Sequence, residues 1–245
     1  MTAPKTEANR ESLHEIFRNL HATRVATMDP AVLQVNIDQR RTLVETADRS
    51  RFVKAGDRVE PFSVPEVDGG TLSLNELVAR GPAVLVFFRF EGCPACNLAL
   101  PYYERNLVPG LRAFGATLVA LSPQVPEKLR AIKTRHALSF RVASDTDNAL
   151  ARRFGILYTA NEASQKLALA NGRPLGDVTG TGTWELPMPT VVVIDGKRVV
   201  RFADVHPDWL LRTEAEPILA AVAALAGDGR AQSAFAAPAG THAQT

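Results

Sequence analysis

Residues 83–96 read AVLVFFRFEGCPAC, and this stretch determines the fold class that the sequence predicts. Its first six residues form a continuous apolar run after Gly81-Pro82, which is typical of a central strand buried on both faces. Cys93 and Cys96 follow at once, and Pro94 between them suits the first turn of a helix. We therefore predict a buried strand, a short turn and a helix that begins at the cysteine pair.

Strands and helices alternate on both sides of this stretch. We expect strands at residues 83–88, 117–121, 140–143, 190–194 and 198–202, and helices at residues 97–114, 126–136, 147–154, 162–170 and 214–226. Such alternation predicts parallel strands joined by helical crossovers. A hairpin about Asp195-Gly196 makes the sheet mixed. The predicted fold class is thus α/β, a central mixed sheet flanked by helices. The secondary structure of residues 155–183 is the hardest to predict from the sequence.

The two ends of the chain lie outside this pattern. Residues 1–50 predict an N-terminal helical extension, whose second helix has Asp29 as its N-cap and Pro30 at its first position. This extension can pack on the main body or on a second subunit, so a homodimer is one arrangement that we consider. Residues 51–227 form the predicted main domain, and residues 228–245, rich in Ala, Gly, Pro and Gln, the predicted flexible tail. The expected buried face of the second helix comprises Leu33, Ile37, Val44 and Ala47.

Composition excludes several classes of partner. Lys and Arg number 28 against 26 acidic residues, and a net charge of +2 is too small to predict binding to nucleic acid or to an anionic membrane. The chain has no apolar run of about 18 residues, and its N-terminus lacks the apolar region of a secretory signal. With only 2 cysteines it does not resemble a secreted disulfide scaffold. We therefore expect a cytoplasmic protein.

The cysteine pair predicts thiol chemistry. The N-terminus of a helix favours negative charge, and a thiol placed there has its pKa lowered from about 8.5 to roughly 3.5–7.5. Because the thiolate is the nucleophile, such a shift activates the sulfur. A second cysteine one turn away can close a disulfide, so one sulfur attacks and the other resolves the product. We expect Cys93 and Cys96 to be the catalytic residues.

Two other interpretations of the pair were weighed. A structural zinc site needs two more ligands, and the sequence has no second CxxC and no CxxH. Two inert core cysteines are the second alternative, since free cysteine is often buried. The chain also lacks GxGxxG, P-loop and HExxH motifs. We therefore expect neither a metal nor a cofactor.

Two further positions bear on the site. In Met188-Pro189 the proline stands just before a strand, and a cis bond there would leave the Met188 backbone exposed beside the cysteines. The alternative is an ordinary trans proline that opens the strand. Arg89 stands at the end of the central strand, where a buried arginine needs a partner. The candidate partners of Arg89 are the Cys93 thiolate and an acid such as Glu91 or Asp145.

These motifs resemble the AhpC/TSA-type peroxiredoxin-like proteins that carry a CxxC, within the thioredoxin superfamily. The resemblance covers about residues 50–226 and keeps the family order. Its motifs are Gly56-Asp57, Pro61-Phe62, Gly81-Pro82, residues 88–98, residues 119–124, Ser144-Asp145, Asn148-Ala149, Phe154-Gly155, residues 184–190, residues 205–209 and Arg212.

The resemblance implies a thioredoxin fold in which Pro189 takes the place of the cis-proline of that fold. It implies that Trp184 packs near the site and that Arg89 or Arg212 supplies a positive charge to the thiolate. It also implies a hydroperoxide or disulfide substrate and a thioredoxin-like or glutathione-like thiol reductant.

The chain departs from the family at one point. Peroxiredoxins carry Thr or Ser three residues before the peroxidatic cysteine. That position is Phe90 if Cys93 is peroxidatic, and Cys93 if Cys96 is peroxidatic, so the order of the two sulfurs stays open. We expect a thiol oxidoreductase that reduces peroxides in an antioxidant role. The alternatives are a thioredoxin-like disulfide oxidoreductase and a non-enzymatic redox sensor on the same fold.

Overall fold

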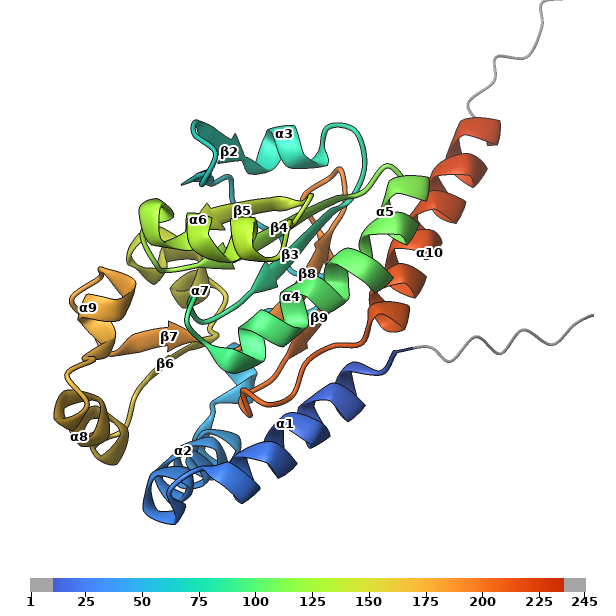
Figure 1. Ribbon diagram of the computed structural model, residues 1–245. Coiled ribbons are helices and arrows are strands. Elements are labelled where there is room, and N and C mark those ends of the chain that lie inside the picture. Colours follow the sequence, from blue (N-terminus) through green and yellow to red (C-terminus); the bar gives the residue numbers. More distant parts are fainter. Residues whose placement is uncertain (1–10, 236–245) are drawn as a thin grey trace, which may run out of the picture.

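The computed structural model describes residues 11–235, and the side chains as far as residue 225 (Figure 1). Its centre is a five-stranded sheet in the order β5-β4-β3-β8-β9. The strands are β3 (Ala83–Phe87), β4 (Thr117–Ser122), β5 (Arg141–Ser144), β8 (Thr190–Ile194) and β9 (Val200–Val205). Strands β3, β4 and β5 are parallel, whereas β8 is antiparallel to both β3 and β9. This confirms the predicted mixed sheet.

The residues of β3 form the middle of the core. All five are buried, because the strand pairs on both sides and helices cover both faces. The register places Phe87 opposite Thr190. The chain therefore leaves β3 toward the cysteines at the edge of the sheet where Met188-Pro189 enters β8.

Helices surround the sheet, and α4 lies across one face of it (Figure 1). They are α3 (Leu74–Val78), α4 (Pro94–Asn106), α5 (Val108–Ala113), α6 (Pro126–Arg135), α7 (Ala149–Arg153) and α10 (Ala215–Phe235), with 3-10 turns at Arg49–Arg51 and Thr146–Asn148. The single helix predicted at residues 97–114 is wrong in one respect. It breaks at Leu107, because Pro109 has no N–H to continue the hydrogen-bond ladder.

The last helix is longer than its sequence predicted. Helix α10 continues to Phe235, past the expected end at residue 226, because this segment is rich in alanine and alanine favours helix. The first part of the expected tail, residues 228–235, is therefore helical. The rest of it, residues 236–245, lies outside the described residues.

Residues 155–183 are folded rather than irregular. Strands β6 (Leu157–Thr159) and β7 (Glu185–Pro187) pair as a small antiparallel sheet. Between them lie α8 (Glu162–Ala170), which has its predicted bounds, and α9 (Leu175–Thr179). Figure 1 shows this unit beside the central sheet. A third small sheet pairs β1 (Ser63–Pro65) with β2 (Thr71–Ser73).

The N-terminal helices α1 (Leu13–Thr27) and α2 (Pro30–Thr46) pack on the body of the same chain, α1 against α4 and α2 against α8. The Asp29 side chain accepts hydrogen bonds from the first N–H groups of α2, as predicted. The predicted buried face is right at Leu33 but wrong at Val44, which is 42% exposed, while its neighbour Leu43 is buried. No described helix is long and apolar enough to span a membrane.

One carboxylate fixes α1 to the body. Glu214 accepts hydrogen bonds from the N–H groups of Leu13 and His14 at 3.0 and 2.9 Å. The Ser12 hydroxyl donates to the same carboxylate at 3.0 Å, and the Tyr102 hydroxyl of α4 does so at 2.7 Å. The carboxylate thus binds the positive N-terminus of α1 and the surface of α4 together.

We expect Glu214→Gln to lower the free energy of unfolding by roughly 1–3 kcal/mol, because the amide loses the negative charge and one acceptor. Urea denaturation of the full chain measures the change. The control is Glu15→Gln, which removes only an exposed pair with Arg18. Equal stability of the two variants would contradict the role assigned to Glu214.

Candidate functional site

The cysteine pair lies where β3 gives way to α4. Cys93 is the N-cap of α4 and Pro94 its first residue, so the helix begins between the two sulfurs as the sequence predicted. Both cysteines are free thiols, and both are buried, Cys93 with 1% and Cys96 with 0% of its surface exposed. Buried sulfur at a helix N-terminus feels the unpaired N–H groups strongly, because little water screens them.

Two side chains at the end of β4 hold the loop before the cysteines. The Ser122 hydroxyl donates to the Arg89 carbonyl at 3.0 Å. Gln124 accepts from the Glu91 N–H at 2.8 Å through its carbonyl oxygen and donates to the Val178 carbonyl, also at 2.8 Å. These bonds fix the loop to the sheet and to α9. The sequence analysis used residues 119–124 only as a family motif and missed this role.

The two sulfurs differ in acidity. The Cys96 thiol donates a hydrogen bond to the sulfur of Cys93, and this bond, with the nearby Arg89 and Arg212 guanidinium groups, lowers the pKa of Cys93 to about 5 against the opposing effect of burial. Burial and the same hydrogen bond raise the pKa of Cys96 well above its usual value. Of the two sulfurs, Cys93 therefore has the lower pKa and ionises first.

Both arginines singled out in the sequence meet at these sulfurs. Arg212 is buried, donates to the carbonyls of Trp209 and Leu211 at 2.5 and 2.7 Å, and points its other nitrogen at the sulfur of Cys96, 3.8 Å away. Burial opposes the charge of Arg89, but the nearby Tyr158 hydroxyl and the two sulfurs more than offset that effect and raise its pKa. Each guanidinium thus neutralises part of the charge on the thiolate.

A group that the sequence analysis missed surrounds Trp209. The guanidinium carbons of Arg24, Arg40 and Arg89 lie 5.2, 5.5 and 4.7 Å from the centre of the indole ring. Arg24 comes from α1 and Arg40 from α2, and Arg40 also pairs with Asp208 at 3.2 Å. No motif marked Arg24 or Arg40, because only the packing of the extension brings them to the site.

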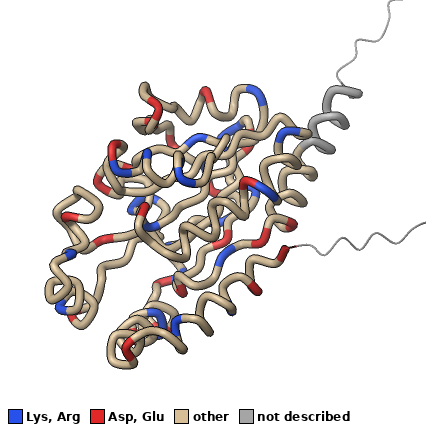
Figure 2. Tube along the Cα trace, viewed as in Figure 1, with Lys and Arg blue, Asp and Glu red and all other residues tan. Residues whose placement is uncertain are grey.

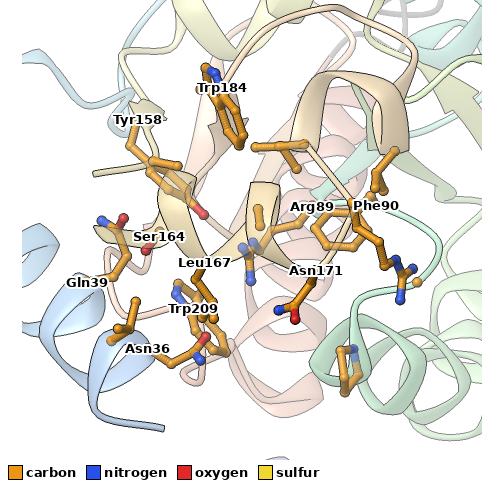
Figure 3. Close-up of a pocket in the computed structure, with 18 residues that line it drawn as sticks. Asn36, Gln39, Arg89, Phe90, Tyr158, Ser164, Leu167, Asn171, Trp184 and Trp209 are labelled. Atoms are coloured by element: carbon orange, nitrogen blue, oxygen red, sulfur yellow. The ribbon is translucent and has the colours of Figure 1, made fainter. Parts of the chain in front are cut away.

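A cavity of about 400 Å³ opens beside the cysteine loop (Figure 3). Gly92 and Pro94, the neighbours of Cys93, form part of its wall. Trp184 also lines it, together with Arg89, in agreement with the expectation for that tryptophan. Figure 3 shows the Tyr158 hydroxyl and the Arg89 side chain directed toward its middle. Elsewhere basic and acidic residues are interspersed along the chain (Figure 2).

Pro189 is placed at the expected edge of the sheet, but its predicted cis bond is wrong. No peptide bond within residues 11–235 is cis, so the ordinary trans proline is the correct alternative. Met188 is buried, and its N–H donates to the Ile156 carbonyl at 2.7 Å. The Pro189 carbonyl accepts from the His206 N–H at 2.9 Å. The Met188 N–H is thus bonded within the fold rather than left open beside the cysteines.

Comparison with known proteins places this geometry in context. A family model described as the AhpC/TSA family matches residues 55–203. Peroxiredoxin Bcp of Escherichia coli K12 is 32% identical over 110 residues, which are 42% of this chain and 65% of that protein. The chloroplastic peroxiredoxin Q of Populus jackii is 26% identical over 104 residues, or 42% of this chain and 48% of that protein. The chain thus spans 65% of the length of the bacterial relative.

Solved structures agree on the fold. Peroxidoxin BcpB from Mycobacterium tuberculosis superposes with a TM-score of 0.56 at 22% identity, covering 71% of this chain and 98% of that one. Peroxiredoxin Q of Xanthomonas campestris gives a TM-score of 0.52 at 16% identity, covering 67% and 91%. The thioredoxin fold predicted from the sequence is confirmed.

We expect the reduced protein to gain thiolate absorbance in the ultraviolet as pH rises through about 5, because that is the pKa of Cys93. A thiol is charged above its pKa. Because the pKa of Cys93 is lowered, its thiolate is lost only when the pH falls below about 5. In Cys93→Ser this step disappears, and the remaining titration, that of Cys96, lies at higher pH, because burial raises the pKa of that thiol.

The arginines can be tested by the same titration. Arg89→Met removes a positive charge that faces Cys93 and moves the titration step to higher pH. The control is Arg201→Met, which removes an arginine of β9 that pairs with Asp195 and leaves the step in place. A step at the same pH in wild type and in Arg89→Met would contradict the electrostatic role of Arg89.

Proposed function

Because the chain belongs to the AhpC/TSA family, we propose that it is a thiol-based oxidoreductase of the peroxiredoxin type, which reduces hydroperoxides through Cys93 and Cys96. The observation that carries the proposal is the pair of unlike sulfurs, a Cys93 thiolate with a pKa of about 5 beside a Cys96 thiol. At pH 7 a group with that pKa is about 99% ionised, against about 3% for an ordinary cysteine.

The proposed reaction has three steps. The Cys93 thiolate attacks the terminal oxygen of the hydroperoxide, so a sulfur–oxygen bond forms, the oxygen–oxygen bond breaks, and the alkoxide takes up a proton to leave as alcohol. The sulfur of Cys96 then attacks the resulting sulfenic acid, and water leaves as the disulfide forms. One dithiol molecule, or two monothiol molecules, supplies two electrons and two protons, restores both thiols and leaves as a disulfide. The reductant is thioredoxin-like or glutathione-like.

The residues around the sulfurs support these steps. Negative charge moves from sulfur to the leaving oxygen in the first step, and the Arg89 and Arg212 guanidinium groups, already oriented, stabilise it there. Trp184 forms part of the wall of the adjoining cavity and Pro189 opens the strand at the same edge of the sheet, so we assign both supporting roles. We propose the cytoplasm as the compartment, because thiols stay reduced there.

We expect the reduced protein to consume hydrogen peroxide at pH 7 faster than free cysteine does, because the roughly thirty-fold larger thiolate fraction and the facing guanidinium groups outweigh the lower intrinsic nucleophilicity of a low-pKa thiolate. Stopped-flow measurement of peroxide loss tests this. Cys93→Ser abolishes the reaction, whereas Cys96→Ser keeps a single turnover and accumulates sulfenic acid, which a dimedone adduct reveals by mass.

The control is the fully alkylated protein. Rates no better than those of free cysteine, or full activity in Cys93→Ser, would overturn the peroxidase assignment. A reversible Cys93–Cys96 disulfide without turnover would then favour a redox sensor on the same fold.

A second function is disulfide exchange of the thioredoxin type, and one observation favours it. The nucleophilic Cys93 is the first cysteine of the pair, and the residue three positions before it is Phe90, which has no hydroxyl to orient a peroxide. A site with a low nucleophile pKa and a resolving thiol reacts with disulfides as readily as with peroxides.

We expect insulin reduction with dithiothreitol to be accelerated by the wild-type protein but not by Cys93→Ser. Because the reduced form is stabilised by the ionised Cys93, we also expect its reduction potential to lie above the value of about −270 mV that is typical of thioredoxin. Equilibration with glutathione buffers measures the potential. A more negative potential, or no insulin reduction, would count against this second function.

A further inference from the structure

We propose that the cavity beside Cys93 binds a small organic anion, a carboxylate joined to an apolar body, and presents it to the thiolate. The inference deepens the proposed function and rests on it for the identity of the reacting group. The binding step itself depends only on the walls of the cavity, so the two can be tested apart.

The walls of the cavity are basic. The 18 residues that line the cavity include Arg89 and Arg173 but no Asp or Glu. Arg24 adds positive charge behind Trp209, which is itself part of the wall, while Arg40 beside it pairs with Asp208. A cavity with basic and no acidic walls attracts anions and repels cations.

Two buried donors beside the cavity have no partner within residues 11–235. The Trp209 indole nitrogen and the Arg89 Nε atom are buried and make no hydrogen bond with the described residues, and the Tyr158 hydroxyl interacts with the Arg89 guanidinium. Tyr158 and Trp209 expose only 7% and 4% of their surface. Indole and guanidinium nitrogens can only donate. Buried donors of this kind are seldom left unpaired, so the missing group is an acceptor, as both carboxylate oxygens are.

The volume and the lining of the cavity suit an organic ligand. A volume of about 400 Å³ is within the range of small-molecule sites and far larger than one water molecule needs. Much of the wall is apolar or aromatic, and it includes Phe90, Leu167, Leu175 and Trp184. An inorganic anion would leave these surfaces unused, whereas an organic carboxylate covers them and gains the free energy of their burial.

The position of the cavity ties its ligand to the cysteine. One wall carries Gly92 and Pro94, which flank Cys93, and the opposite walls come from α2 and from α8. The Arg173 side chain approaches Gly92 from the α8–α9 connection. A ligand held in the cavity therefore lies beside the cysteine loop. Its reacting group is a hydroperoxide in a substrate or a thiol in a reductant.

Binding can be measured without turnover. The chain has only 2 tryptophans, Trp184 and Trp209, and both line the cavity, so intrinsic fluorescence reports occupancy directly. We expect 4-phenylbutyrate to quench the fluorescence of the reduced full chain and to bind at least about ten-fold more tightly than 4-phenylbutyramide, its neutral analogue, because charge-assisted hydrogen bonds to the carboxylate are lost in the amide.

Two variants test the residues. Tyr158→Phe removes one buried donor, and Arg173→Met removes a charge from an exposed side chain whose loss leaves the core intact. Each weakens binding of 4-phenylbutyrate several-fold. The matched control Arg80→Met, also at an exposed arginine but outside the cavity, leaves it unchanged.

Equal affinity for carboxylate and amide, no quenching by either, or equal effects of Arg173→Met and Arg80→Met would each overturn the proposal. Cys93→Ser separates the two proposals, since it abolishes turnover and keeps binding. Peroxidase activity without binding of 4-phenylbutyrate would overturn only the proposal for the cavity. Binding of 4-phenylbutyrate without peroxidase activity would overturn only the proposed function.

Steady-state kinetics distinguish whether the bound carboxylate belongs to the hydroperoxide substrate or to the thiol reductant. Arg173→Met is compared with wild type on a carboxylate-bearing alkyl hydroperoxide and cumene hydroperoxide, then on mercaptoacetate and mercaptoethanol as reductants. A rise in KM for the charged hydroperoxide alone identifies a substrate site, and a rise for the charged thiol alone identifies a reductant site. Unchanged values for both charged compounds would contradict presentation of the ligand to Cys93.

Discussion

The site depends on the attraction between a buried guanidinium and a buried sulfur. No carboxylate in the described part of the chain pairs with Arg89, and its Nε atom has no hydrogen-bond partner. A buried cation without a counter-charge is strongly unfavourable, so the Cys93 thiolate and Arg89 stabilise each other in their charged forms. The anchors from Ser122 and Gln124 keep the loop in place, which fixes the separation on which this attraction depends.

The N-terminal helices belong to this arrangement although the family match begins only at residue 55. Phe17 of α1 lies against Arg212, with the guanidinium carbon 5.5 Å from the ring centre. Arg24 and Arg40 pack on the other face of the site through Trp209. The hydrogen bonds of Glu214 keep α1 docked. The extension therefore shields both site arginines from water and strengthens their effect on the sulfurs.

The sequence was informative where the signal was local. The buried strand, the helix start at Cys93 and the cap at Asp29 follow from neighbouring residues, so they were predicted correctly. Arg24, Arg40 and Tyr158 escaped notice because they reach the site through packing of distant segments, for which one sequence carries no signal. The cis bond at Pro189 was a wrong expectation of another kind, since cis is the minority form even before proline.

The thiolate is also a charge that the protein can lose. When Cys93 and Cys96 join in a disulfide, the negative charge beside Arg89 and Arg212 vanishes while both guanidinium groups stay. An anion in the neighbouring cavity then meets a stronger field than it did in the dithiol form. Thermodynamic reciprocity gives the converse, that such an anion draws the equilibrium toward the disulfide. With the binding proposed for the cavity, the oxidation state of this chain would in that way be coupled to the concentration of small anions around it.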